Sequence, residues 1–312
     1  MNIGIDMMGG DFAPLEAVKG VQLYLSGHNI PAKLTLIGNK EQLEKLVTEH
    51  KTPLENITIV HAEQVIGMHE HPTKALKEKQ QSSIAIGFQL LASGKMDAFI
   101  SAGNTGAMLV GALFSIKALE GVIRPTISSI IPKSEGGTGL LLDVGLNADC
   151  KPVQLNQFAI MGTVYAKHIL GIENPKVGLI NVGEEEGKGN LLAQATYPLL
   201  KGNKHINFIG NIEGRDVLLD KADVMVCEGF TGNIILKLAE SLYEISNQKK
   251  VESPYFERFN FENYGGTPVL GVAKPVIIGH GISGSKAFMN MIHLAQLMIE
   301  KKLMEKMKEE LS

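Results

Sequence analysis

The chain has 312 residues, a formal net charge of −3 at pH 7 and hydrophobic residues at 44% of its positions. This length and composition allow one large or two medium-sized domains with a substantial buried core, and they exclude a disordered protein. A net charge this close to zero gives no electrostatic argument for a nucleic-acid partner, and the lack of any run of 18 apolar residues gives none for a membrane-spanning helix.

Short runs rich in Ile, Val and Leu recur along the chain and are typical of buried strands. They alternate with helical patterns, which predicts an α/β protein: a layered αβα sandwich with a largely parallel sheet. The expected strands are 2–6, 33–37, 57–60, 98–101, 127–131, 139–143, 176–181, 206–209, 224–227 and 276–279, with a hairpin turn at 133–137. The expected helices are 15–25, 40–49, 84–92, 107–119, 153–170, 190–200 and 233–245, and one long amphipathic helix carries Phe288, Ile292, Ala295, Ile299 and Leu303.

Ligands of such sheets bind beyond the carboxyl ends of the strands, so the residues after each strand are the candidate site. The first strand ends in Asp6-Met-Met-Gly-Gly-Asp11. Asp11 favours a role as cap of the helix that begins near Pro14. Asp6 is either a hydrogen-bond anchor for a neighbouring loop or a site residue, and the sequence leaves both interpretations open.

A second strand leads into Ser101-Ala-Gly-Asn-Thr-Gly-Ala107, which is followed by a helical pattern. Gly103 and Gly106 let the backbone approach a ligand, while Asn104 and Thr105 offer donors beside the free N–H groups of the next helix. This pattern predicts an anion cradle. A tight turn that merely needs glycine is the alternative.

Two further strand ends carry the same chemistry. Asp143 and Asn147 flank Gly145 in Leu141-Leu-Asp-Val-Gly-Leu-Asn147, where a phosphate or amide-bearing ligand finds polar groups. Thr231, Gly232 and Asn233 follow the strand at 224–227 and precede a helix, as Asn104 and Thr105 do. The sequence therefore predicts a second cradle for a substrate group.

The loop Gly183-Glu-Glu-Glu-Gly-Lys-Gly189 is one residue short of a Walker A loop and lacks its Ser or Thr, and it also fails the dinucleotide fingerprint. Lys188 is expected to bind a single phosphate group, and a solvated acidic turn is the alternative. Near the last strand, His280 and Lys286 are candidates for a proton donor and a cation. His280 is equally consistent with a structural residue.

Two other patterns do not support a site. His69-Glu-His-Pro72 lacks a second ligand cluster with zinc spacing, so neither a metal nor a cofactor is predicted. Cys150 lies beside Lys151, but no His-Asp arrangement can be assigned to activate it as a nucleophile, and Cys227 is expected in the core.

Taken together, the strand-end motifs are similar to those of the bacterial phosphate acyltransferase family, PlsX. Each motif alone is weak, but their order and spacing along nearly the whole chain are specific. The motifs are Asp6-x-Met-Gly-Gly-Asp11, Ser101-Ala-Gly-Asn-Thr-Gly-Ala107, Leu141-Leu-Asp-Val-Gly145, Gly210-Asn-Ile-Glu-Gly-Arg-Asp216, Gly229-Phe-Thr-Gly-Asn233 and Tyr264-Gly-Gly-x-Pro268.

The resemblance implies that inorganic phosphate attacks the thioester of a fatty acyl-acyl carrier protein, which gives acyl phosphate for phospholipid synthesis. It also implies a homodimer, a fold similar to phosphotransacetylase and isocitrate dehydrogenase, and a link to the membrane glycerol-3-phosphate acyltransferase that uses acyl phosphate. We expect one unit over 1–312, with lobes 1–105 plus 265–312 and 106–264. The expected catalytic residues are Asn104, Lys188 and His280, and the expected substrate-binding residues are Asp6, Gly103, Thr105, Gly106, Asp143, Asn147, Thr231, Gly232, Asn233 and Lys286.

The sequence departs from the family pattern at Phe12, at Glu228 and in the short polar connection 246–263, where family members commonly have a longer apolar and basic helical pair that contacts membranes. Two rival functions stay open. One is a dehydrogenase on the related fold, although neither a nicotinamide site nor a cluster of metal-binding aspartates is evident. The other is a non-catalytic module that binds acyl carrier protein or an acyl chain.

Two cysteines and a start without a basic-then-apolar leader favour a reducing, cytoplasmic compartment. In the connection 246–263, an aromatic cluster is expected to pack on a neighbouring helix or a second subunit. Lys249, Lys250 and Arg258 offer anionic lipid about 1 kcal/mol each, which predicts only weak, salt-sensitive attachment. We therefore expect a soluble cytoplasmic dimer with at most transient membrane contact.

Overall fold

The computed structural model describes residues 1–27 and 32–311. The chain forms two compact units, which we call unit 1 (Met1–Ala118 with Phe261–Glu300) and unit 2 (Leu119–Asn260 with Lys301–Ser312). These divisions lie at different points from the lobes expected from the sequence. The described C-terminal residues from Lys301 onward belong to unit 2, whereas the sequence grouped them with the first lobe.

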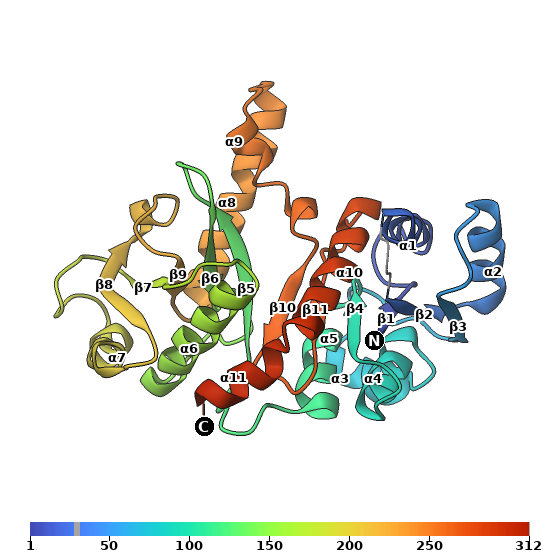
Figure 1. Cartoon of the computed structure of the whole chain (residues 1–312), viewed down its shortest axis with the longest axis horizontal. Helices are drawn as coiled ribbons and strands as arrows, with labels where there is room; N and C mark the ends of the chain where they lie inside the picture. Colours follow the sequence, from blue (N-terminus) through green and yellow to red (C-terminus); the bar gives the residue numbers. More distant parts are fainter. Residues whose placement is uncertain (28–31, 312) are drawn as a thin grey trace. The chain divides into compact units, whose positions relative to one another are not determined.

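Unit 1 contains a sheet in the order β3-β2-β1-β4-β11-β10. Its strands are parallel except β10, which is antiparallel to β11. Figure 1 shows α1 and α10 on one face of these strands and α4 on the other. The strands are β1 (Asn2–Asp6), β2 (Lys33–Gly38), β3 (Ile57–His61), β4 (Ala98–Ser101), β10 (Thr267–Leu270) and β11 (Val276–Ile278). The helices are α1 (Leu15–Gly27), α2 (Lys40–Glu49), α3 (Pro72–Glu78), α4 (Ser83–Ala92), α5 (Thr105–Gly111), the π-helical η1 (Ala112–Ile116), the 3₁₀ turn η3 (Phe261–Asn263) and α10 (Ser285–Glu300).

Unit 2 contains a sheet in the order β5-β6-β9-β7-β8, in which the hairpin β5–β6 is antiparallel and the other pairs are parallel. Helix α6 packs on β6 and β9, and α8 packs on β5 and β6 (Figure 1). The strands are β5 (Thr126–Pro132), β6 (Thr138–Leu142), β7 (Lys176–Asn181), β8 (Asn207–Glu213) and β9 (Val224–Val226). The helices are α6 (Pro152–His168), α7 (Leu191–Gly202), the 3₁₀ turn η2 (Gly214–Asp216), α8 (Gly229–Lys249), α9 (Pro254–Glu257) and α11 (Leu303–Leu311).

Local sequence signals account for several helix starts. Asn39, Ser82 and Asn190 each accept a hydrogen bond from a backbone N–H in the first turn of α2, α4 and α7, respectively. Such caps satisfy donors that a helix start leaves unpaired. In the core of unit 1, Phe88 and Phe99 meet edge to face with ring centroids 5.2 Å apart, a favoured aromatic geometry.

The α/β class, the ten expected strands and the hairpin turn are confirmed. The sequence analysis did not predict β10, which is only four residues long and contains Pro268. It also did not predict α3, a helix of seven residues. The single long helix expected at the end of the chain is wrong. Helix α10 ends at Glu300, and Lys302 adopts a left-handed backbone with φ 51° before α11 begins. Leu303 fits the apolar spacing of the expected helix and is buried, but it is the first residue of α11 and belongs to unit 2.

Candidate functional site

Three loops of unit 1 meet where the parallel strands β1, β4 and β11 end. The backbone N–H of Asp11 donates to the Gly281 carbonyl at 2.7 Å. A Cβ at Gly10 would lie 3.1 Å from that same oxygen, and one at Gly9 would lie 2.6 Å from the Gly103 nitrogen. Because neighbouring parallel strands bring their carboxyl ends to one edge, these contacts assemble the first candidate site from three distant parts of the chain.

Asp6 anchors this cluster from inside. Its side chain is fully buried and accepts hydrogen bonds from the Ser101 hydroxyl at 2.7 Å and the Met8 backbone N–H at 3.0 Å. Ser101 in turn accepts from the Gly103 N–H at 2.9 Å. Burial raises the pKa of the Asp6 carboxyl, although these hydrogen bonds counteract part of the rise. These contacts show that Asp6 anchors the neighbouring loop, and its part in binding substrate stays a prediction.

Asn104 is almost completely buried, and its amide group is fully engaged within unit 1. Its Oδ1 accepts from the Ala107 N–H at 2.9 Å and so caps α5. Its Nδ2 donates to the carbonyls of Gly67, Met68 and Glu70 at 2.9, 3.2 and 3.0 Å. The side chain therefore fixes the loop that precedes α3 against the start of α5.

The loop held by Asn104 contains the His69-Glu-His motif. Glu70 accepts from the Gly67 N–H and from the Lys79 ammonium group, both at 2.6 Å. These hydrogen bonds lower the pKa of the Glu70 carboxyl, with the one from Lys79 contributing most. Within residues 1–27 and 32–311, no group of three or more His, Cys, Asp or Glu side chains is arranged to hold a metal ion. Glu70 thus has a structural explanation in the loop itself.

The other predicted residues of unit 1 lie around this cluster. Thr105 is exposed at the start of α5, while Gly106 leaves no room for a side chain against Pro72. His280 follows β11 and lies 4.4 Å from the Phe261 ring, centroid to centroid. Lys286, in the first turn of α10, donates to the Asn263 side chain at 2.5 Å. The backbone N–H groups at 284, just before α10, and at 285, its first residue, already donate to carboxylates.

In unit 2, Asp143 repeats the part that Asp6 plays in unit 1. Its buried carboxylate accepts from the N–H groups of Gly145 and Leu146 at 2.7 and 2.8 Å, and from the Asn147 amide at 2.6 Å. Burial raises the pKa of the Asp143 carboxyl. The Asn147 amide also donates to the Pro125 carbonyl at 2.9 Å. Asp143 and Asn147 together fix the turn that follows β6.

The loop after β9 joins this turn. The Gly229 N–H donates to the Asn147 carbonyl at 2.7 Å, and the Asn233 amide donates to the Val144 carbonyl at 3.2 Å. Gly232 packs so closely on the Asp143 carbonyl that a Cβ would overlap it. The residues predicted from the two strand ends of unit 2 are therefore brought together.

Glu228 and Arg124 are two polar residues of this cluster that sequence reasoning did not select. Glu228 caps α8, accepting from the Thr231 N–H at 3.1 Å and from its hydroxyl at 2.5 Å. The exposed Arg124 donates to the Asn147 side chain at 3.5 Å. The sequence offers one signal for each: Glu228 follows a strand, and Arg124 directly precedes Pro125 and a strand. Their proximity to Asn147 depends on tertiary contacts.

Lys188 lies apart from the cluster of unit 2, whereas Cys150 belongs to it, with its thiol 3.6 Å from the Asn147 carbonyl. Lys188 is exposed, with its ammonium group 4.0 Å from the Glu185 carboxylate, and its carbonyl accepts from Asn181 at the end of β7. Burial, reinforced by the carboxylates of Asp143 and Glu228, raises the pKa of the Cys150 thiol to about 12. A thiol with such a pKa stays protonated at neutral pH, which argues against a nucleophilic role.

Comparison with known proteins identifies relatives of the whole chain. A family model described as "Fatty acid synthesis protein" matches residues 1–306. A phosphate acyltransferase from Thermoanaerobacterium thermosaccharolyticum is 46% identical, with 96% of this chain and 93% of the relative covered. Another from Dictyoglomus turgidum is 42% identical, with 100% and 98% covered. These relatives do not favour the dehydrogenase alternative.

Solved structures share the fold at low sequence identity. A phosphotransacetylase from Streptococcus pyogenes has a TM-score of 0.69 at 16% identity, over 96% of this chain and 94% of its own. A 4-hydroxythreonine-4-phosphate dehydrogenase from Klebsiella pneumoniae has a TM-score of 0.56 at 12% identity, over 95% and 96%. The expected similarity to a phosphotransacetylase-like fold is thereby confirmed.

The contacts of Asn104 predict how its loss affects stability. Asn104→Ala removes a helix cap, which costs about 0.5–2 kcal/mol. It also removes the two N–H donors that the Gly67, Met68 and Glu70 carbonyls share, and each carbonyl left buried without a donor adds about 1–3 kcal/mol. Asn39→Ala is the matched control, because Asn39 caps α2 but is exposed and makes no such set of bonds. Urea unfolding of both variants should show the larger loss at Asn104, and equal losses would contradict its role in holding the loop.

Asp6 predicts a pH dependence of stability. Between the ordinary carboxyl pKa of 3.8 and its raised value, the folded chain keeps a proton on Asp6 that the unfolded chain has lost. Folding therefore becomes less favourable as pH rises through that interval, by up to about 1.4 kcal/mol per pH unit. Asp6→Asn cannot titrate, so the stability of the wild type relative to this variant should fall as pH rises above 3.8. A difference that does not change with pH would show that the pKa of Asp6 is ordinary.

Proposed function

The chain belongs to the phosphate acyltransferase family and transfers an acyl group to phosphate, and we propose that the acyl donor is a fatty acyl thioester of acyl carrier protein. The product is an acyl phosphate for phospholipid synthesis. The observation that carries the proposal is the pair of glycine-rich strand-end clusters, each fixed by a buried carboxylate, Asp6 in one and Asp143 in the other. Such clusters position small polar groups without supplying a nucleophile.

The reaction needs no nucleophile from the protein, because phosphate itself is one. A phosphate oxygen attacks the thioester carbon, and the C–O bond forms as the carbonyl oxygen takes up negative charge. The C–S bond then breaks, and the carrier thiolate leaves and takes up a proton. Such a reaction is accelerated by holding both reactants in line and by fixed donors aimed at the developing oxyanion. The protonated Cys150 thiol is consistent with direct attack by phosphate.

The residue roles follow from which donors are already occupied. Asn104 spends its amide on three carbonyls, so we assign it the positioning of the α5 start, where the N–H groups of Thr105 and Gly106 serve phosphate. Gly103 allows phosphate to approach the backbone closely. We assign His280 to proton transfer to the leaving thiolate and Lys286 to charge neutralisation.

We propose that the cluster of unit 2 also binds substrate. Asp143 and Asn147 hold the turn after β6, and Gly232 permits its close packing on α8. Thr231 and Asn233 lie near the start of α8. The Thr231 hydroxyl donates to the Glu228 carboxylate, and the Asn233 amide donates to the Val144 carbonyl. We propose that Asn233, whose amide has a second N–H, binds the acyl donor, and that Thr231 holds the Glu228 cap in place beside it.

Lys188 gives a prediction that separates two sources of its effect. Its exposed ammonium group suits either phosphate or the acidic surface of the carrier protein. Lys188→Ala should lower kcat/KM for acyl-phosphate formation in both cases, since either contact is charge-assisted. Excess phosphate restores the rate only if Lys188 binds phosphate. Lys201→Ala removes another exposed lysine of unit 2 and serves as the control. Unchanged kinetics at every phosphate and carrier concentration would exclude both roles for Lys188.

The assembly and location are also proposed. We propose a cytoplasmic homodimer that delivers acyl phosphate to the membrane glycerol-3-phosphate acyltransferase and touches the bilayer only transiently. Among the residues that the structure describes, no helix is long and apolar enough to cross a bilayer. Of Lys249, Lys250 and Arg258, the three cations considered for lipid contact, Arg258 donates to the carbonyls of Lys133 and Gly137. This supports a structural role for Arg258. Strong co-sedimentation with anionic liposomes at physiological salt would contradict transient contact.

One assay tests the proposed function. Purified protein is incubated with a fatty acyl thioester of acyl carrier protein and inorganic phosphate, and both acyl phosphate and released thiol are measured. We expect the two products in equal amounts. A dehydrogenase would instead change the absorbance of a nicotinamide cofactor, and a binding module would retain the thioester unchanged. Formation of acyl phosphate from acyl-coenzyme A but not from the carrier protein would overturn the proposed donor and leave the family activity intact.

A further inference from the structure

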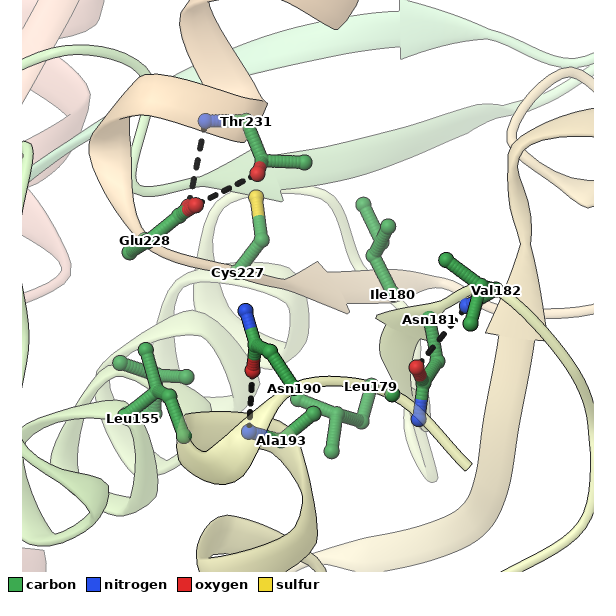
Figure 2. A pocket seen from close by; sticks show the side chains of 12 residues that line it. Leu155, Leu179, Ile180, Asn181, Val182, Asn190, Ala193, Cys227, Glu228 and Thr231 are labelled. Atoms are coloured by element: carbon green, nitrogen blue, oxygen red, sulfur yellow. Dashed lines mark hydrogen bonds between the residues drawn. The ribbon is translucent and has the colours of Figure 1, made fainter.

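A pocket of about 270 Å³ lies within unit 2, where β7 and β9 end. Its wall combines side chains from α6, β7, α7, the turn that follows β9 and the first turn of α8 (Figure 2). Most of the wall is apolar, and it includes Leu155, Leu179, Ile180, Leu192, Ala193 and Cys227. Ligand pockets are commonly lined in this way, with a few polar groups at defined points.

The polar side chains of the pocket bind to one another or to backbone. The Thr231 hydroxyl donates to Glu228, and Asn190 accepts from the Ala193 N–H at 2.8 Å. Asn181 accepts from the Val182 N–H and donates to the Lys188 carbonyl, at 2.8 and 3.0 Å. An apolar ligand can therefore enter without leaving these groups unpaired, which would otherwise cost binding energy.

The pocket adjoins the cluster of unit 2. Cys227 and Glu228 follow β9, and the Cys227 N–H donates to the Leu142 carbonyl at the end of β6 at 2.9 Å. Asp143 comes next in that strand end, and Cys227 Sγ lies 3.8 Å from its carbonyl oxygen. A ligand lying in the pocket with a polar head at Glu228 and Thr231 thus has that head beside the turn fixed by Asp143.

We propose that this pocket receives the hydrocarbon chain of the acyl donor and limits its length, an inference that rests on the proposed function. Scaling from a cavity of about 150 Å³ that holds benzene, the volume accommodates roughly ten carbon atoms. Val182, 81% exposed at the edge of the pocket, offers apolar surface where a longer chain leaves it. A phosphate group suits the pocket poorly, because its wall offers few donors and it carries the Glu228 carboxylate.

The test fills the pocket and follows chain-length preference. Ala193→Leu adds three carbon atoms at a buried wall position, and it should lower the ratio of kcat/KM for dodecanoyl to butyryl donors by about 10-fold to 100-fold, as hydrophobic pockets discriminate by such factors. Ala195→Leu is the matched control: the same substitution in α7 at an exposed position that does not line the pocket. Its ratio should match that of the wild type.

A second variant changes the pocket in the opposite direction and keeps the proposal testable if Ala193→Leu folds poorly. Leu192→Ala enlarges the pocket from a half-exposed position, so it should move the preferred chain to greater length. Ala193→Leu could instead lower kcat/KM equally at all chain lengths, with its thermal unfolding unchanged. That result would assign the pocket to the pantetheine group that carries the acyl chain and would overturn the proposal. So would unchanged length preference in both variants.

A binding measurement separates this inference from the proposed function. Decanoyl-pantetheine carries the acyl thioester without the carrier protein, and its affinity is measured by calorimetry. Ala193→Leu should weaken this binding at least 10-fold relative to Ala195→Leu, even if the carrier protein proves to be the wrong donor. Equal affinity of the two variants would overturn the acyl-chain pocket while leaving acyl transfer to phosphate untouched.

Discussion

Both units depend on one arrangement, a buried carboxylate placed where a strand ends. Asp6 at the end of β1 and Asp143 directly after β6 are shielded from solvent, and each is surrounded by hydrogen-bond donors from adjoining segments. A buried charge without partners costs several kcal/mol, so these positions are tolerable only while the donors stay in place. The carboxylates therefore select one conformation for the loops that leave neighbouring strands.

This constraint explains the glycines of the strand-end motifs. Gly9 has no room for a Cβ against the Asp6 carboxylate, and Gly232 has none against the Asp143 carbonyl. Their first requirement is close packing on the anchors, and access of a ligand to the backbone follows from it. For a reaction in which phosphate is the nucleophile, rigid loops with fixed N–H groups provide orientation and charge stabilisation without reorganising during the chemical step.

Asn104 illustrates where sequence reasoning stopped. Its place between a strand and a helix predicted a polar role, and the cap of α5 is of that kind. The three carbonyls it binds belong to residues 67–70, more than thirty positions earlier, and no local pattern reveals such a partner. Lys188 shows the reverse case. Its predicted loop is present, but among the described residues of unit 2 no hydrogen bond or ion pair joins its side chain to Asp143.

The sequence by itself determined the α/β class, ten strands and the strand ends that carry the candidate site, because hydrophobic periodicity, caps and glycine turns are local properties. Tertiary structure alone decided which loops meet, that Asp6 and Asp143 are anchors, and that α10 ends before Lys302. It also decided that Leu155, Leu179 and Ala193 enclose a pocket. Those outcomes depend on burial and on contacts between distant residues, where the cost of an unpaired polar group or an overlapping Cβ is set by neighbours that the local sequence does not contain.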